Sequence, residues 1–378
     1  MIRKVCIISR GYPTDKKPWF PFVDQLVCAF TEQGIKCTVI SPQSITNTLK
    51  ERKEFRSQKW IKKVNNNEIN IIQPYYISFS NLTVGRFNFS NFFFEKAVVE
   101  AFKSLPDKSF DAIYGHFWEC GLLAAKLGRE YSIPAFVATG ESTINLNKNS
   151  KDIEFKKFLK GVIAVSTKCK DESIGLELCT QKDVEVFPNA INPKLFYLQD
   201  KASCRKELKI PLDEFVIAYV GYFNERKGSR RLSNVLERFD DVYSIFIGSG
   251  TDIPNCKNQL YTGTLPHHAI SKYLNAADVF VLPTLHEGCC NAIIEAMACG
   301  LPVISSNKSF NWDILDESNS ILIDPLNENE LYEAISELKT NKEKRLKLRE
   351  GALNKAKSLC IEKRARSILQ FMERKINE

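Results

Sequence analysis

Residues 275–306 constrain the fold of this chain more than any other stretch. Residues 278–282 form a short run rich in β-branched and aromatic side chains that predicts a buried strand, and a proline ends it. Residues 291–298 carry apolar side chains at helical spacing, which predicts a helix. Gly300 and a second proline follow, as is usual where a helix stops, and residues 303–305 open the next strand. The stretch is therefore predicted to be a βαβ unit of an α/β fold.

In parallel α/β sheets, ligands bind beyond the carboxyl ends of the strands, which is where residues 283–290 are expected to form a loop. This loop leads into a helix N-terminus, whose backbone N–H groups can hold a phosphate. Glu287 lies in the loop, and Glu295 follows about two turns into the helix. A carboxylate accepts hydrogen bonds from neighbouring sugar hydroxyls. The pair indicates a nucleoside diphosphate-sugar site, although a single Glu of this kind is more often a solvated surface residue.

Residues 286–305, HEGCCNAIIEAMACGLPVIS, resemble the EG-x6-E-A-x-A-x-G-x-P-V signature of retaining glycosyltransferases of family 4, the glycosyl transferases group 1. Members of that family have the GT-B fold. The resemblance implies that Glu287 contacts the donor sugar and that Glu295 binds the ribose hydroxyls. It also implies that the backbone amides of Asn291 and Ala292 hold the β-phosphate.

A second loop with the same chemistry follows the predicted strand 215–220. Gly221 lets a phosphate approach the backbone, and Lys227 supplies a compact positive charge. The spacing is not that of a Walker A loop, so an ATPase is disfavoured. The resemblance places an Arg and a Lys on the donor pyrophosphate. The position of that Arg is Tyr222 here, so Arg226 is the candidate for the missing charge; the alternative for Lys227 is a solvated lysine at a helix start.

The chain opens with a β-loop-α-β pattern over residues 5–41, which suits a doubly wound sheet. Farther on, residues 110–115 predict a buried strand with His116 just past its end. A lone His is usually structural, but a His at the carboxyl end of a strand is well placed for a ligand. The surrounding segment resembles the His-containing strand end of family 4. The resemblance implies that His116 contacts the donor sugar near the reacting carbon.

Length and composition set the remaining bounds. A chain of 378 residues with 44% hydrophobic and 26% charged residues is expected to form two soluble domains. It has no apolar run long enough for a membrane helix and no signal peptide, so a cytoplasmic enzyme is expected. The twelve cysteines form no C-x-x-C pair and no Cys/His cluster, so no metal site is expected. The net charge of +8 suits anionic partners, but no nucleic-acid motif accompanies it, so no nucleic-acid partner is expected.

Two stretches of the first domain bear on the acceptor. Residues 50–63 hold seven Lys or Arg and two Glu, within a segment, 48–67, that predicts a mobile loop or an exposed helix. Residues 87–94 hold five Phe, which indicates a core helix or, alternatively, an exposed apolar surface. Together they lead us to expect a sugar or lipid-linked sugar as acceptor, and peripheral association with the anionic inner face of the cell membrane.

Residues 184–196 resemble the interdomain hinge of family 4. The resemblance implies a GT-B fold of two Rossmann-like, doubly wound domains facing a cleft. We place an acceptor-side domain at residues 1–190, with the C-terminal helix, about 362–378, packing back on it. The nucleotide-sugar-binding domain is placed at residues 191–361.

The resemblance implies a retaining hexosyltransferase that uses a nucleoside diphosphate-sugar, with UDP as the commonest base in the family. The acceptor is a hydroxyl in surface polysaccharide or glycolipid assembly. Lys227, Arg226 and a helix N-terminus are expected to neutralise the departing diphosphate, so no cofactor is expected. A nucleotide-sugar epimerase or phosphorylase with the same fold is an alternative, and so is a non-catalytic sugar-nucleotide-binding protein.

Overall fold

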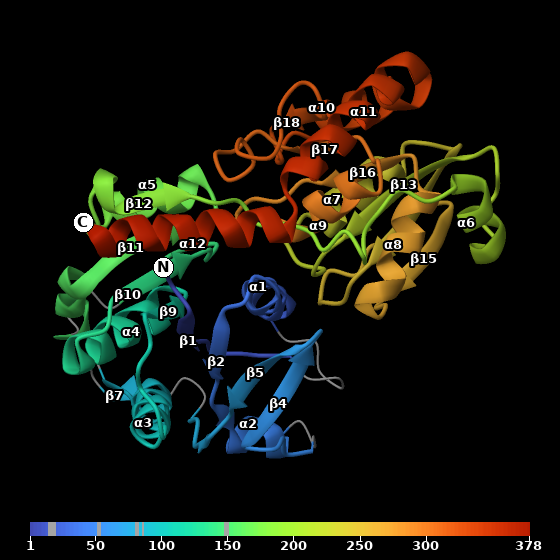
Figure 1. Cartoon of the computed structure of the whole chain (residues 1–378). Helices are drawn as coiled ribbons and strands as arrows, with labels where there is room; N and C mark the ends of the chain where they lie inside the picture. The colour runs from blue at the N-terminus through green and yellow to red at the C-terminus, as the bar shows by residue number, and fades with distance from the viewer. Residues whose placement is uncertain (14–19, 51–53, 80–82, 85–86, 147–150) are drawn as a thin grey trace. The chain divides into compact units, whose positions relative to one another are not determined.

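The computed structural model describes residues 1–13, 20–50, 54–79, 83–84, 87–146 and 151–378. The chain forms two compact units (Figure 1). Unit 1 comprises Met1–Val165, Cys169–Phe187 and Ala365–Glu378, and unit 2 comprises Ser166–Lys168 and Pro188–Arg364. Each unit is built around one large, mainly parallel sheet, so the prediction of an α/β chain with two Rossmann-like domains is confirmed.

The sheet of unit 1 has eight strands in the order β12-β11-β10-β9-β1-β2-β5-β4. All neighbouring strands are parallel except β4 and β5, which are antiparallel. The strands are β1 (Lys4–Ile8), β2 (Lys36–Ile40), β4 (Lys59–Val64), β5 (Asn67–Ile72), β9 (Ala112–His116), β10 (Ala135–Thr139), β11 (Leu159–Ala164) and β12 (Val184–Val186). Two short pairs accompany the sheet: β3 (Gln43–Ser44) with β6 (Tyr75–Tyr76), and β7 (Thr83–Val84) with β8 (Phe87–Asn88).

The helices of unit 1 are α1 (Pro21–Glu32), α2 (Ile45–Lys50), α3 (Phe89–Lys103), α4 (Trp118–Tyr131) and α5 (Thr167–Gly175), with the 3₁₀ helices η1 (Lys151–Phe158) and η2 (Gln181–Asp183). Helices α3 and α4 share one apolar core, in which Phe94 and Phe102 of α3 and Leu127 of α4 are buried with Ile113 of β9. The last helix, α12 (Ile361–Asn377), also packs in this unit: its Phe371 ring lies 5.5 Å from that of Phe187.

The prediction of a loop or helix for residues 48–67 is wrong at residues 59–64. Helix α2 ends at Lys50, and β4 occupies residues 59–64 as the antiparallel edge strand beside β5. In β4 the exposed side chains of Lys59, Ile61 and Lys63 alternate with half-buried ones. A half-buried strand is usually recognised by apolar and polar residues alternating with a period of two. In β4 a lysine also occupies a half-buried position, so this alternation is not visible in the sequence. Residues 51–53 of the basic stretch lie outside the described residues.

Both readings of the Phe-rich stretch hold in part. Helix α3 begins at Phe89, and Phe94 is fully buried in the core of unit 1. Phe92 is 47% exposed, and its ring lies 5.4 Å from that of Phe93. The helix therefore contributes Phe94 to the core and presents Phe92 to solvent.

Unit 2 contains a six-stranded parallel sheet in the order β15-β14-β13-β16-β17-β18. Its strands are β13 (Phe215–Val220), β14 (Val242–Ile247), β15 (Gln259–Gly263), β16 (Val279–Leu282), β17 (Val303–Ser306) and β18 (Ser320–Ile323). Its helices are α6 (Lys201–Leu208), α7 (Ser229–Leu236), α8 (His267–Ala276), α9 (Asn291–Ala298), α10 (Glu328–Thr340) and α11 (Lys342–Ser358). The predicted βαβ unit is confirmed as β16, α9 and β17, and Gly300 has the left-handed φ of 76° that terminates α9.

In the part of the chain that the structure describes, no helix is both long enough and apolar enough to cross a membrane.

Candidate functional site

Two loops of unit 2 meet at the carboxyl edge of its sheet. Strands β13 and β16 are paired and parallel, so the loop 221–228 after β13 and the loop 283–290 after β16 leave the same edge. A hydrogen bond joins them: Leu285 N–H donates to the Arg226 carbonyl at 2.8 Å, and the Thr284 hydroxyl oxygen lies 3.2 Å from the same carbonyl oxygen. Each loop ends at a helix N-terminus, α7 or α9. The pairing of the strands therefore brings together side chains about 60 residues apart in sequence.

One carboxylate oxygen, Oε1 of Glu287, is the centre of this junction. Lys227 Nζ lies 2.6 Å from it, Arg226 Nη1 lies 3.1 Å from it, and the Thr284 hydroxyl donates to it at 2.8 Å. Arg226 Nη1 also donates to the His286 carbonyl at 2.6 Å. The structure thus brings together Glu287, Lys227 and Arg226, the three charged residues that are predicted from the sequence as site residues in these loops.

The three charged side chains of the cluster differ in their exposure to solvent. The side chains of Lys227 and Glu287 are 13% and 10% exposed, whereas that of Arg226 is 38% exposed. Burial disfavours the Lys227 ammonium, but the neighbouring Cys290 and Glu287 outweigh burial and raise the pKa of Lys227 above its usual value. Burial also raises the pKa of Cys290, whose sulfur lies 3.9 Å from Lys227 Nζ. At neutral pH Lys227 is therefore a charged ammonium in an ion pair with Glu287.

Gly228 fixes the approach of the two loops. It has φ of 75° and forms the N-cap of α7. A Cβ at this position would lie 2.6 Å from the carbonyl oxygen of Pro283. Gly221, at the other end of the same loop, has its N–H bonded to the Ile247 carbonyl at 3.0 Å. The close contact of Gly228 with Pro283 holds Lys227 against the loop that carries Glu287.

We expect Gly228→Ala to lower the melting temperature of the protein measurably. An L-residue in the left-handed region costs about 1–2 kcal/mol, and the clash with Pro283 adds to this cost. Gly34→Ala is the matched control, because Gly34 has φ of 86° with no atom within 4 Å of its added Cβ. Equal losses in the two variants, measured by thermal unfolding, would contradict the packing role of Gly228.

The first turn of α9 follows the cluster directly. Asn291 and Ala292 are its first two residues, and amides in this position have no acceptor within the helix. The Asn291 Oδ1 atom is buried and has no hydrogen-bond partner among the described residues. In the second turn, Glu295 Oε1 lies 2.9 Å from Nε2 of His267, the first residue of α8. The residues expected to hold phosphate and ribose therefore follow one another along α9.

His116 belongs to unit 1, where it is the last residue of β9. Its side chain is buried, and its ring lies 5.2 Å from that of Phe22 and 4.5 Å from that of Phe117. The strand end is where the sequence placed it. The role that family resemblance gives to His116 stays a prediction.

A cavity of about 410 Å³ opens at the carboxyl edge of the sheet in unit 1. Arg10, after β1, forms its polar wall: Nε donates to Glu119 at 2.7 Å, and Nη2 donates to Asn91 at 2.7 Å. Glu141, after β10, accepts from the Trp118 N–H at 2.6 Å. Leu122 adds an apolar wall. The cavity combines paired charges and apolar surface, as small-molecule sites do.

Sequence reasoning missed several polar residues around these sites. Thr284 and His267 each contact one of the two nominated carboxylates, and Arg10 and Glu141 line the cavity of unit 1. All four lie just past the end of a strand in a parallel sheet, which is the one signal that could have selected them. That signal alone does not separate them from other polar loop residues.

A family model described as glycosyl transferases group 1 matches residues 200–355. TuaC of Bacillus subtilis (strain 168), named as a glycosyltransferase of teichuronic acid biosynthesis, is 29% identical over 355 residues, covering 88% of this chain and 88% of that protein. A UDP-Gal:alpha-D-GlcNAc-diphosphoundecaprenol alpha-1,3-galactosyltransferase of Escherichia coli is 27% identical over 247 residues, covering 58% of this chain and 63% of that protein.

Solved structures match the whole chain. Sucrose-phosphate synthase from Thermosynechococcus elongatus has a TM-score of 0.78 at 18% identity, covering 99% of both chains. Anabaena HepE in complex with UDP-glucose has a TM-score of 0.70 at 15% identity, covering 98% of this chain and 99% of that one. At these identities the likeness concerns the fold.

Proposed function

We propose that this chain, which belongs to the glycosyl transferases group 1 and has the GT-B fold, transfers a hexosyl group from a UDP-sugar to an acceptor hydroxyl with retention of configuration. The setting is polysaccharide or glycolipid biosynthesis, in agreement with the names of its relatives. The observation that carries the proposal is the contact of Lys227 and Arg226 with Glu287 in the loop before α9, with Glu295 about one turn into that helix.

The diphosphate of the donor binds at this start of α9. The backbone amides of Asn291 and Ala292 donate to the β-phosphate, and Lys227 and Arg226 supply positive charge. The donor sugar then gives its hydroxyl hydrogen bonds to Glu287. When the donor binds, the ion pair between Lys227 and Glu287 is replaced by contacts of Lys227 with the diphosphate and of Glu287 with the sugar hydroxyls. Both buried charges therefore keep a partner.

In the transfer step, the acceptor oxygen forms a bond to the anomeric carbon as the bond from that carbon to the diphosphate breaks. The acceptor attacks from the face that the diphosphate leaves, so the configuration is retained. The proton of the acceptor hydroxyl passes to a phosphate oxygen of the leaving group. Charge grows on the diphosphate during this step, and in this proposal the Lys227 ammonium stabilises it.

We expect sugar transfer to continue in the presence of excess EDTA. Two cationic side chains and a helix N-terminus provide the charge that a divalent ion would otherwise supply. The measurement is the initial rate of UDP release from UDP-sugar in an assay with acceptor, with and without chelator. An activity that is lost in EDTA and restored by Mg²⁺ or Mn²⁺ would show that the diphosphate is neutralised in another way.

The experiment that tests the proposed function is a product analysis. The protein is incubated with a panel of UDP-sugars, with and without a sugar or sugar-lipid acceptor, and the products are identified by mass spectrometry and NMR. The proposal requires acceptor-dependent UDP release and a new glycosidic bond with the donor's anomeric configuration. Isomerised donor without transfer would indicate an epimerase, consumption of inorganic phosphate would indicate a phosphorylase, and binding without turnover would indicate a sugar-nucleotide-binding protein.

For the acceptor we propose the cavity of unit 1. Its lining holds two cations, Arg10 and Lys126, and three carboxylates, Glu95, Glu119 and Glu141. Arg10 is bound to Glu119, and Lys126 Nζ lies 3.9 Å from Glu95. With its cations already paired, the lining suits the hydroxyls of an uncharged sugar ring better than an anionic sugar.

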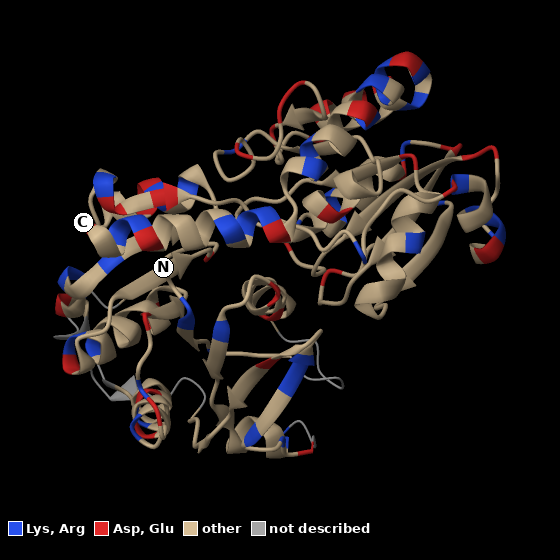
Figure 2. Ribbon diagram, in the orientation of Figure 1, with Lys and Arg blue, Asp and Glu red and all other residues tan. Residues whose placement is uncertain are grey.

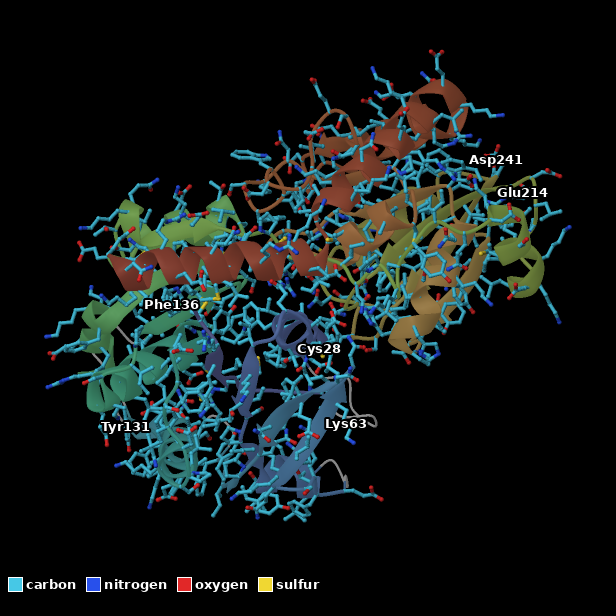
Figure 3. All side chains as sticks on the ribbon, viewed as in Figure 1. Cys28, Lys63, Tyr131, Phe136, Glu214 and Asp241 are labelled. Atoms are coloured by element: carbon cyan, nitrogen blue, oxygen red, sulfur yellow. The ribbon has the colours of Figure 1, made fainter. Side chains whose placement is uncertain are left out.

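We further propose that the acceptor sugar is attached to a lipid and that unit 1 touches an anionic membrane surface. The exposed side chains of β4 are Lys59, Ile61 and Lys63. Figure 2 shows the Lys and Arg positions of this strand in blue, and Figure 3 labels Lys63. Lys62 of the same strand instead forms an ion pair with Asp24 at 2.6 Å, so it does not belong to this face. Other large exposed apolar side chains of this region are Leu49, Phe55, Ile77, Phe79 and Phe92.

Hydrogen bonds link the segments that carry Leu49, Ile77, Phe79 and Phe92. The Ser44 and Thr46 hydroxyls contact Ser78 at 2.6 Å, and the Phe79 N–H donates to Ser90 at 2.8 Å. The start of α2, the segment after β6 and the start of α3 are therefore neighbours. Ile61 lies between the two outward lysines of β4, and apolar side chains together with lysines are the combination that binds anionic bilayers, with each Lys near the surface contributing about 1 kcal/mol.

We expect the protein to sediment with vesicles that contain anionic lipid at low salt, and much less at high salt. Changing Lys59 and Lys63 together to Glu should reduce the bound fraction about tenfold or more, because two attractive charges become repulsive. Changing Lys342 and Lys347 of α11 to Glu makes the same charge change in unit 2 and is the control. Equal binding by the two double variants would mean that β4 is not part of the membrane-binding surface.

A further inference from the structure

His267 is a titratable partner of Glu295 that neither of the two loops contains. It is the first residue of α8, and its Nε2 lies 2.9 Å from Oε1 of Glu295 on α9. The side chains of His267 and Glu295 are 28% and 13% exposed. The ring of Phe196 lies 5.0 Å from the imidazole in an edge-on arrangement and limits its rotation. The contact is therefore a fixed one between two helices, in a largely water-excluded place.

Because of this contact, the two oxygens of the Glu295 carboxylate have different roles. A carboxylate offers two oxygens, and here one of them, Oε1, is held by His267. With Oε1 held, the orientation of the carboxyl group about its last torsion is set, and Oε2 is left to accept from another donor. A side chain with this torsion fixed in advance loses less freedom when a ligand binds.

Among the residues that the structure describes, Glu295 is the charged side chain recorded against this imidazole from the elements around α8. Glu207 of α6 forms its ion pair with Lys272 of α8 instead. On α9 the Cys299 thiol lies against Ser271 of α8, one turn farther along, and burial raises the pKa of Cys299 to about 12, so the thiol is neutral. The hydrogen bond with Glu295 raises the pKa of His267 above its usual value, against the effect of burial.

We propose that His267 is a positioning residue of the nucleotide site, which orients Glu295 toward the ribose hydroxyls and makes nucleotide affinity depend on pH. The inference rests on the proposed function, because it takes Glu295 as the ribose-binding residue. The imidazolium form donates a charge-assisted hydrogen bond to Glu295, whereas a neutral ring donates a weaker one or, in its other tautomer, none.

The sign of the pH dependence follows from charge. A bound nucleoside diphosphate brings negative charge to the site, which stabilises the imidazolium further and raises the pKa of His267 in the complex. Binding then takes up a proton. Affinity is therefore greatest below the pKa of His267 in the free protein, and it falls as the pH rises through the pKa of the free protein and then that of the complex.

The test is UDP affinity by isothermal titration calorimetry between about pH 5.5 and 8.5 for the full chain and three variants. In His267→Ala we expect UDP to bind about five- to tenfold more weakly than in the unsubstituted protein at the acid end, with less difference at the alkaline end. In His267→Gln the amide can donate to Glu295 but does not titrate. We expect it to restore much of the affinity and to show the flatter pH profile of His267→Ala. His268→Ala is the matched control, since His268 is the exposed neighbour on α8.

The outcomes separate this inference from the proposed function. The titration of UDP itself is common to all four proteins, so only differences between their pH profiles count. If UDP binds the unsubstituted protein and His267→Ala binds it equally well at every pH, the positioning role is wrong while the proposed function stands. If a folded, unsubstituted protein binds no nucleoside diphosphate at all, the proposed function fails, and this inference fails with it. Thermal unfolding of each variant shows whether a loss of affinity reflects a loss of fold.

Discussion

Replacing Lys227 with Ala should lower kcat for sugar transfer about a hundredfold or more. Lys227 Nζ lies 2.6 Å from Glu287 in a largely buried position, and its raised pKa keeps it charged at neutral pH. Negative charge on the leaving diphosphate grows toward the transition state, so the ammonium stabilises the transition state more than the bound donor. The measurement is steady-state UDP release at saturating donor, with KM recorded separately.

Arg226→Ala is the informative companion to this variant. Arg226 contacts the same carboxylate oxygen, but its side chain is more exposed, so solvent screens its charge and we expect a smaller loss of kcat. Lys257→Ala, which removes an exposed lysine paired with Asp240, should leave kcat unchanged. If Lys227→Ala lowers only the affinity for donor and keeps kcat within about threefold, the lysine stabilises the bound donor and the transition state equally. Its assignment to the leaving group is then wrong.

The βαβ unit around α9 could be predicted from the sequence because several local signals agree there. The apolar run of β16, the helical spacing of α9 and the stop at Gly300 each indicate the same structure. Edge strand β4 could not be predicted in the same way. Its inward-facing residues include Lys62, whose charge is satisfied by Asp24 of α1, a partner that only the folded chain supplies.

The candidate site shows the same limit. Glu287, Lys227 and Glu295 were nominated individually from loop position and family resemblance, and the pairing of β13 with β16 explains why the first two meet. The contact between His267 and Glu295 depends on how α8 packs beside α9. A sequence pattern reports the period of one helix, but not the neighbour that its polar face meets. Residues that act through another residue are therefore the ones that local patterns miss.

The two carboxylates of the site should separate binding from transfer. Glu295→Ala should weaken the binding of donor and of free UDP alike, by about 1.5–3 kcal/mol, because both ligands carry the ribose. Glu287→Ala should lower the rate of transfer while leaving the affinity for free UDP nearly intact, since its proposed partner is the sugar, which UDP lacks. Each variant is the control for the other, because each removes one carboxylate with a basic partner in the same unit.

The measurement is a pair of titrations with UDP and UDP-sugar, followed by steady-state kinetics on each variant. Removing Glu287 also frees Lys227 from its ion pair, so any change in UDP affinity should be toward tighter binding. Weaker binding of free UDP by the same factor in both variants would mean that both carboxylates act on the nucleotide. The donor sugar would then need another partner, and Asn291, whose buried Oδ1 has no partner among the described residues, would be the next residue to test.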